Sequence, residues 1–115
     1  MKLNLSGKTA LITGAGRGIG AGIADVFEKV GIKAVRADIS DVTCEADWEA
    51  AIDFLADHYG AFDILINNAG VLFNEPIAEF SAASLDILPA VNIRGVQLGL
   101  KHAFLAMRPG GRFGK

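Results

Sequence analysis

A glycine-rich turn between a short apolar strand and an amphipathic helix constrains this chain more than any other feature. Residues 8–13 form an apolar run typical of a parallel strand buried on both faces, and apolar residues recur at helical spacing over 18–30. Glycines let the backbone approach a phosphate closely, and a helix N-terminus offers free N–H groups and a positive dipole end. The sequence therefore predicts a nucleotide-binding turn, and a merely flexible loop is the alternative. The residues expected to form it are Thr13, Gly14, Gly16, Arg17, Gly18, Ile19 and Gly20.

Strand and helix patterns alternate along the whole chain, and no repeat or low-complexity linker marks a domain boundary. The expected strands are 8–13, 33–38 and 62–67, and the expected helices are 18–30, 46–58 and about 82–107. Right-handed crossovers place the first strand between the other two and the later helices on the face opposite the first helix. We therefore expect an α/β fold: one domain over 1–115 with a doubly wound parallel sheet of about three strands.

A second motif, Asn67-Asn68-Ala69-Gly70, follows the third strand. Its small residues permit close backbone approach and its Asn amides can bridge neighbouring strands, although a polar loop cap is the alternative interpretation. The glycine turn and this motif together resemble the short-chain dehydrogenase/reductase family, and further matches run from about Leu5 to Gly111. The resemblance implies NAD or NADP bound at the carboxyl ends of the strands, with the second motif lining the adenosine and ribose region. It also implies hydride transfer between nicotinamide and a carbonyl or alcohol. By comparison with the family, the domain over 1–115 is shortened, and its Rossmann-like sheet is incomplete, with about three strands plus a C-terminal stub.

An acidic residue closes the second strand. Asp38 lies about 20 residues beyond the glycines, the separation of a carboxylate that accepts from the adenosine ribose hydroxyls. Because such a carboxylate repels a 2′-phosphate, NAD is favoured over NADP. Arg17 or Arg36 could still neutralise that phosphate, and Asp38 could instead be an ordinary solvated loop acid.

The segment after Asp38 is shorter than the resemblance implies. Asp41 and Val42, followed by Thr43, resemble a family landmark near the adenine that normally comes after a further strand. Counting from the glycine turn places Asp38 at the cofactor, and counting back from Asn67 places Asp41 there. Both hold only if a helix and a strand are missing between them.

Candidates for catalysis are few. Asn92 resembles the family asparagine that organises a proton relay, although Pro89 makes a tolerated Asn at a helix irregularity the alternative. The family's catalytic Ser and Tyr-xxx-Lys have no match, because Tyr59 is the only tyrosine, Asp63 stands four residues after it, and no serine follows Asn92. We therefore expect the chain to bind a dinucleotide but to need further residues for an alcohol or carbonyl substrate. The other hypotheses are a non-enzymatic nucleotide-binding or oligomer-forming protein and a relic that binds nothing.

Composition narrows the remaining classes. The net charge of −2 and scattered basic residues argue against nucleic acid, and no apolar stretch is long enough to span a membrane. The N-terminus lacks the hydrophobic core of a signal peptide, so the expected location is cytoplasmic. Cys44 is the only cysteine and is expected to be a passive small residue. His58 and His102 are single helical residues, and no cluster has metal-ligand spacing.

The last predicted helix carries more apolar residues than one sheet-facing stripe requires. One side holds Ile93, Val96, Leu100, Phe104 and Met107, and another holds Val91, Leu98 and Leu105. In the family the corresponding helices pair between subunits, so a homo-oligomer is expected, with burial inside a monomer as the alternative.

Overall fold

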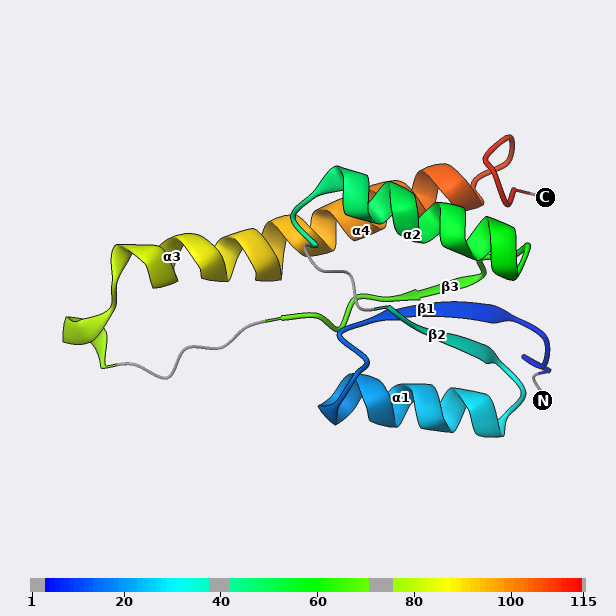
Figure 1. Cartoon of the computed structure of the whole chain (residues 1–115), viewed down its shortest axis with the longest axis horizontal. Helices are drawn as coiled ribbons and strands as arrows, with labels where there is room; N and C mark the ends of the chain where they lie inside the picture. Colours follow the sequence, from blue (N-terminus) through cyan, green and yellow to red (C-terminus); the bar gives the residue numbers. More distant parts are fainter. Residues whose placement is uncertain (1–3, 38–41, 71–75, 115) are drawn as a thin grey trace.

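The computed structural model describes residues 4–37, 42–70 and 76–114 as a sheet with helices on both faces (Figure 1). The first half contains β1 (Thr9–Thr13), α1 (Gly18–Lys29), β2 (Lys33–Ala37) and α2 (Glu45–His58). The second half contains β3 (Ile64–Ile66), the 3₁₀ turn η1 (Ile77–Glu79), α3 (Ala82–Pro89), the π-helical segment η2 (Ala90–Gly95) and α4 (Val96–Met107).

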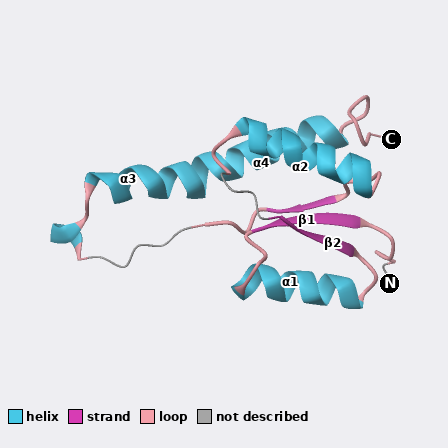
Figure 2. Cartoon of the chain, in the orientation of Figure 1, coloured by secondary structure: helices cyan, strands magenta, loops and turns pink. Residues whose placement is uncertain are grey.

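The three strands form one parallel sheet in the order β2-β1-β3, with α1 on one face and α2 and α4 on the other (Figure 2). Thr9 pairs with Lys33 in one neighbour, and Ala10 pairs with Ile64 in the other. All five residues of β1 are buried because a strand and a helical layer cover each side. The predicted α/β class, strand order and distribution of helices are therefore confirmed.

The core lies in two layers, one on each face of the sheet. Between the sheet and α2 and α4, the fully buried Leu11, Trp48 and Leu55 pack with smaller apolar side chains. Ile12 and Ala24 fill the thinner layer beneath α1. Successive residues of β1 thus serve opposite layers, as the alternation of a strand requires.

Two predicted segments differ in the structure. The strand expected over 62–67 pairs only from Ile64 to Ile66, because the Asp63 carboxylate takes the Thr9 N–H at 2.9 Å before the ladder begins. The expected C-terminal stub is not a strand within the described residues. It turns back instead, with the Phe113 N–H on the Ala106 carbonyl at 2.8 Å and its ring edge-on to Phe62 at 6.1 Å.

The helix expected over 82–107 runs continuously but changes type within its length. Pro89 is the last residue of α3, and the six residues after it form one wide π-helical segment before α4 begins. The expected interruption at Pro89 thus takes the form of a π segment, one of the few ways in which an α-helix is locally interrupted without ending. Among the described residues, no helix combines the length and apolar character needed to cross a membrane.

Candidate functional site

The site begins where β1 and β3 end side by side, and a buried hydroxyl joins them. Thr13 Oγ1 accepts from the backbone N–H groups of Asn68 at 3.1 Å and Ala69 at 2.9 Å, and it donates to the Ile66 carbonyl at 3.5 Å. Only 1% of Thr13 is exposed. Because its hydroxyl is fully engaged, Thr13 shapes the site from beneath.

The Asn68 side chain ties the second motif to the glycine bend. Its Nδ2 donates to the carbonyls of Thr13 and Gly14, both at 3.1 Å. A Cβ on Gly20 would lie 2.4 Å from that nitrogen and 2.8 Å from the Gly14 oxygen. The two predicted motifs therefore form one unit, in which a glycine at position 20 leaves room for the amide.

The bend itself depends on glycine conformation and delivers a bare helix N-terminus. Gly14 and Gly18 both have φ of 63°, in the left-handed region that favours glycine. Helix α1 begins at Gly18, and its N-cap residue Arg17 makes no side-chain capping bond. The first N–H groups of α1 therefore have neither helical partners nor a side-chain cap, and no acidic residue lies in the first turn. This arrangement suits an anion.

An open groove of about 410 Å³ lies at the carboxyl ends of β1 and β2. Its lining consists of Gly14, Ala15, Gly16, Arg17, Arg36 and Ala37. The only titratable side chains in this described lining are two arginines. The described part of the lining can therefore attract negative charge, and it includes no carboxylate, imidazole or thiol that could transfer a proton.

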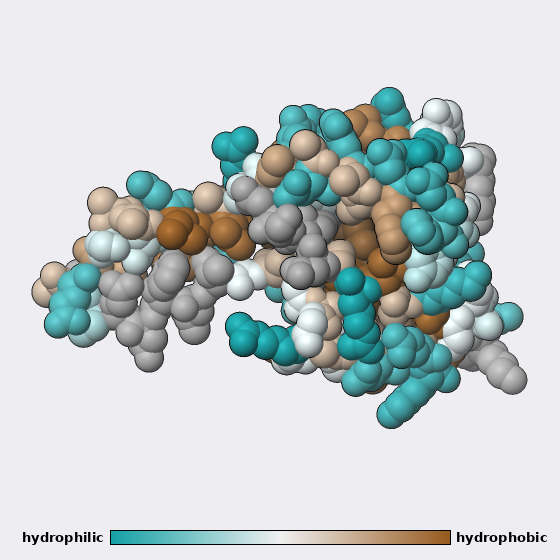
Figure 3. Space-filling view, viewed as in Figure 1, coloured by the Kyte–Doolittle hydropathy of each residue, from teal (hydrophilic) through white to brown (hydrophobic). Residues whose placement is uncertain are grey.

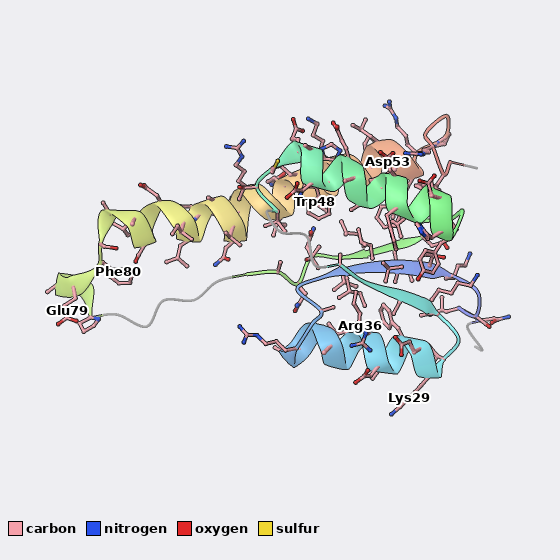
Figure 4. The ribbon with its side chains drawn as sticks, viewed as in Figure 1. Lys29, Arg36, Trp48, Asp53, Glu79 and Phe80 are labelled. Carbon is pink, nitrogen blue, oxygen red and sulfur yellow. The ribbon has the colours of Figure 1, made fainter. Side chains whose placement is uncertain are left out.

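The two arginines of the groove differ in their partners. Arg36, labelled in Figure 4, has its Nη2 2.6 Å from Asp25 Oδ1 and 3.3 Å from Glu28 Oε1, both on α1. The hydrogen bond to Asp25 is the main cause that raises the pKa of Arg36. The Arg17 side chain makes no ion pair or hydrogen bond with any residue that the structure describes.

The remaining motif residues reach toward the long helix. Asn67 Nδ2 donates to the Val96 carbonyl at 3.4 Å, and a Cβ on Gly99 would lie 2.5 Å from Asn67 Oδ1. Asn92 sits in the π segment, where its Oδ1 lies 3.3 Å from the position of a Cβ on Gly70. The structure thus brings the relay candidate next to the second motif.

The other predicted residues are distributed unevenly. Ile19 follows the bend and is 79% exposed. Val42 lies in the core, where its carbonyl accepts from Trp48 Nε1 at 2.8 Å, and it does not line the groove. Asp38 and Asp41 lie outside the described residues.

Sequence reasoning left Ala15 and Ala37 out of the site, although both line the groove. The available signal was a small residue at the end of β2 and another two residues beyond the end of β1. Arg36 entered only as a possible phosphate partner, because its carboxylate neighbours come from a separate helix. No group of three or more metal-ligating side chains occurs within residues 4–37, 42–70 and 76–114.

A family model described as enoyl-(acyl carrier protein) reductase matches residues 39–113. The chain is 36% identical to (+)-borneol dehydrogenase 2 of Salvia officinalis over 95% of this chain and 47% of that protein. It is 35% identical to sorbitol dehydrogenase of Cereibacter sphaeroides over 98% of this chain and 52% of that protein. The chain spans about half the length of the curated relatives it matches.

Solved structures of dehydrogenases and reductases are also similar to this chain. A 3-ketoacyl-(acyl-carrier-protein) reductase from Brucella melitensis complexed with NADH has a TM-score of 0.78 at 35% identity, covering 84% of this chain and 48% of that chain. A short chain dehydrogenase from Burkholderia cenocepacia J2315 in complex with NADP has a TM-score of 0.81 at 27% identity, covering 95% and 54%. The Salvia match runs over 134 positions, more than the 115 residues present here, so that relative has residues without a counterpart in this chain.

Proposed function

The chain belongs to the short-chain dehydrogenase/reductase family, and from that premise we propose that its glycine bend holds the diphosphate of NAD as the cofactor half of an oxidoreductase site. The observation that supports this most directly is the unit made by Thr13, Asn68 and Gly20. It fixes the bend beside a bare helix N-terminus. When bound, the nicotinamide would supply hydride transfer to or from a carbonyl or alcohol carbon.

The residues present fit a dinucleotide. Glycines at 14, 16 and 18 leave the backbone of the bend accessible, and no atom lies within 4 Å of a Cβ placed on Gly16 or Gly18. The first N–H groups of α1 would hold the diphosphate, and the groove toward Ala37 would hold the adenosine. Asn67, Asn68, Ala69 and Gly70 would flank the ribose side.

NAD remains favoured over NADP. The chain passes from Ala37, in the groove, directly to Asp38, which the sequence places where a carboxylate accepts from ribose hydroxyls. The two cofactor-bound relatives hold NADH in one case and NADP in the other, so they support a nicotinamide dinucleotide without choosing between them.

We further propose that these 115 residues bind the cofactor without turnover. The sequence has no Tyr-xxx-Lys and no serine after Asn92. General acid–base catalysis typically contributes about 10²- to 10⁴-fold in rate, and the lining residues that the structure describes include no group to supply it. Asn92 would act only as a relay-positioning residue once an acid is provided. Cytoplasmic location stays a prediction.

Fluorescence titration tests the cofactor proposal. We expect NADH emission to change saturably on adding the purified chain, with competition by NAD. Absence of saturable binding would contradict both hypotheses in which the chain binds a nucleotide. The remaining hypothesis would then be a relic that binds nothing. The same chain is also incubated with NADH and carbonyl substrates, with boiled protein as the control. Oxidation of NADH by the native chain but not by the boiled chain would contradict the expectation of no turnover.

A second proposal concerns self-association. Helix α4 turns its small residues Gly99 and Ala103 toward the core and leaves Leu100 and Phe104 exposed at 52% and 65%. Ile93 continues this exposed stripe at 63%. Apolar side chains on one helical face are expected to be covered, and we propose that a second copy of this chain covers them.

A further inference from the structure

The charge available to a ligand in the groove depends on how Arg36 is held. Its guanidinium meets three acceptors on α1: the Ala21 carbonyl at 3.5 Å, Asp25 at 2.6 Å and Glu28 at 3.3 Å. Positions 21, 25 and 28 follow one face of a helix, and α1 packs against β2, the strand that carries Arg36. Figure 4 shows Arg36 lying against α1.

These contacts leave Arg36 poorly suited to a further anion. Two carboxylates on one guanidinium give the cluster a net charge of about −1, and they occupy donors that would otherwise point to a phosphate. Arg17 differs because, among the described residues, it has no such partner. Thus the Arg36 guanidinium is already paired with carboxylates, whereas the Arg17 guanidinium has no described partner and can contact a ligand.

We propose that Asp25 and Glu28 are positioning residues that hold the Arg36 guanidinium against α1 and so bias the adenosine end of the groove against a 2′-phosphate. The inference rests on the proposed function, because it concerns the cofactor subsite at the end of β2. In this type of fold, a nearby arginine accommodates the 2′-phosphate, whereas an acid accepts from the free 2′-hydroxyl. A carboxylate pair on the neighbouring helix would occupy the donors of the arginine that the first case requires, without changing any residue of the groove lining.

The ion pairs of Arg36 with Asp25 and Glu28 can be removed by mutation because all three side chains are partly exposed. The side chains of Arg36, Asp25 and Glu28 are 35%, 61% and 52% exposed, and exposed ion pairs contribute little to folding stability. Removing both carboxylate charges should therefore release Arg36 without unfolding the chain. A released guanidinium can bind a phosphate through two N–H groups.

The test compares two cofactors in the full chain. Dissociation constants for NADH and NADPH are measured by fluorescence in wild type and in Asp25→Asn/Glu28→Gln. The competitors AMP and adenosine 2′,5′-bisphosphate repeat the comparison at the adenosine end alone. We expect the double variant to bind NADPH and the bisphosphate about three- to tenfold more tightly, the gain from relieving one or two exposed ion pairs, and NADH and AMP within about twofold of wild type.

Two further variants separate the restraint from a general change in charge. Glu49→Gln/Asp57→Asn removes the same charge from exposed positions on α2, across the sheet from α1, and should leave the NADPH-to-NADH ratio unchanged. Adding Arg36→Gln to the Asp25→Asn/Glu28→Gln variant should abolish its gain. Circular dichroism checks that each variant is folded.

The possible outcomes test the restraint on Arg36 separately from the proposed binding of a dinucleotide. Equal gains for NADH and NADPH, no gain, or a gain that survives Arg36→Gln would overturn the restraint while leaving a dinucleotide site in place. Failure of wild type to bind either dinucleotide would overturn the proposed function and the inference with it.

Discussion

Gly20 and Gly22 stand two positions apart on α1, yet a methyl group would meet different surroundings at each. At Gly20 it would lie 2.4 Å from Asn68 Nδ2, 2.8 Å from the Gly14 carbonyl oxygen and 3.0 Å from the Ala15 Cα. Two of these atoms belong to the backbone and cannot rotate away. At Gly22 nothing lies within 4 Å. The lack of space for a side chain therefore makes glycine necessary at position 20 but not at position 22.

We expect Gly20→Ala to destabilise the chain by about 1–3 kcal/mol, as overpacking does, and to weaken NADH binding because Asn68 must move. Gly22→Ala should stabilise it by about 0.5–1 kcal/mol, because alanine restricts the unfolded chain and suits a helix. Urea unfolding of both variants measures the difference. Equal stabilities would mean that the close approach of Asn68 to α1 does not exist in solution.

At the residue scale, the sequence predicted which motifs form the site but not the individual hydrogen bonds that join them. The strand, glycines and helix identified the bend, and the Asn motif was recognised as a bridge between strands. The hydroxyl of Thr13 was not recognised as the acceptor that joins them, because that role appears only when β1 and β3 are neighbours. The same holds for Arg36, whose partners lie 11 and 8 residues earlier on another element.

Among the elements, α2 and α4 are joined by charge as well as by the core. Glu45, in the first turn of α2, accepts from Lys101 Nζ at 2.5 Å and contacts His102 Nε2 at 3.2 Å. The hydrogen bond from Lys101 is the main cause that lowers the pKa of Glu45, and His102 adds to it. The folded chain therefore holds the carboxylate ionised at a lower pH than the unfolded chain does.

This shift fixes the sign of a pH effect. Above the ordinary glutamate pKa both states are ionised, and the contribution of Glu45 to stability is fully present. As the pH falls from there toward the lower folded pKa, the unfolded state takes up the proton first and the contribution is lost. We expect wild type to exceed Glu45→Gln in stability near neutral pH and to lose that advantage in acid.

Urea unfolding of both proteins across that range, at low and high salt, measures the effect. Glu49→Gln is the control, because Glu49 lies on the same helix and makes no ion pair with a described residue. An advantage of wild type over Glu45→Gln that persists in strong acid would contradict the assignment.

Element boundaries followed the sequence where glycine terminates a helix. Gly31 and Gly60 have φ of 88° and 67°, and α1 and α2 end within two residues before them. The extent of β3 was not predictable, because the run over 62–67 reads as strand throughout while the Asp63 side chain replaces the first ladder contact. The π segment after Pro89 was foreseen only as an irregularity.

The molecule as a whole is more extended than its size requires. Its radius of gyration is 15.7 Å, against ~13 Å for a compact domain of this length. Its accessible surface is 7326 Å², against ~6,000 Å² for a compact 12.1 kDa monomer. Figure 1 shows the cause, since α3 and the 3₁₀ turn project from the body, and Figure 3 shows apolar residues exposed along that projection. Leu85 and Ile87 of α3 are 58% and 44% exposed.

An excess of apolar surface on one long helix favours a symmetric pairing. A stripe along a helix is self-complementary across a twofold axis, because the same residues meet from both copies. Leu100 and Phe104 lie one turn apart in this stripe and are its central members in α4. A charge introduced there would be buried without a partner in the pair, although it would stay solvated in the monomer.

We therefore expect the wild-type chain to self-associate in sedimentation equilibrium and Leu100→Glu to raise the dissociation constant by more than about tenfold, equivalent to a loss of more than ~1.4 kcal/mol. Val26→Glu is the matched control, because Val26 is 57% exposed on α1, across the sheet from α4. It should leave the association unchanged. A wild-type chain that stays monomeric at high concentration, or equal weakening by both substitutions, would show that α4 is not the contact face.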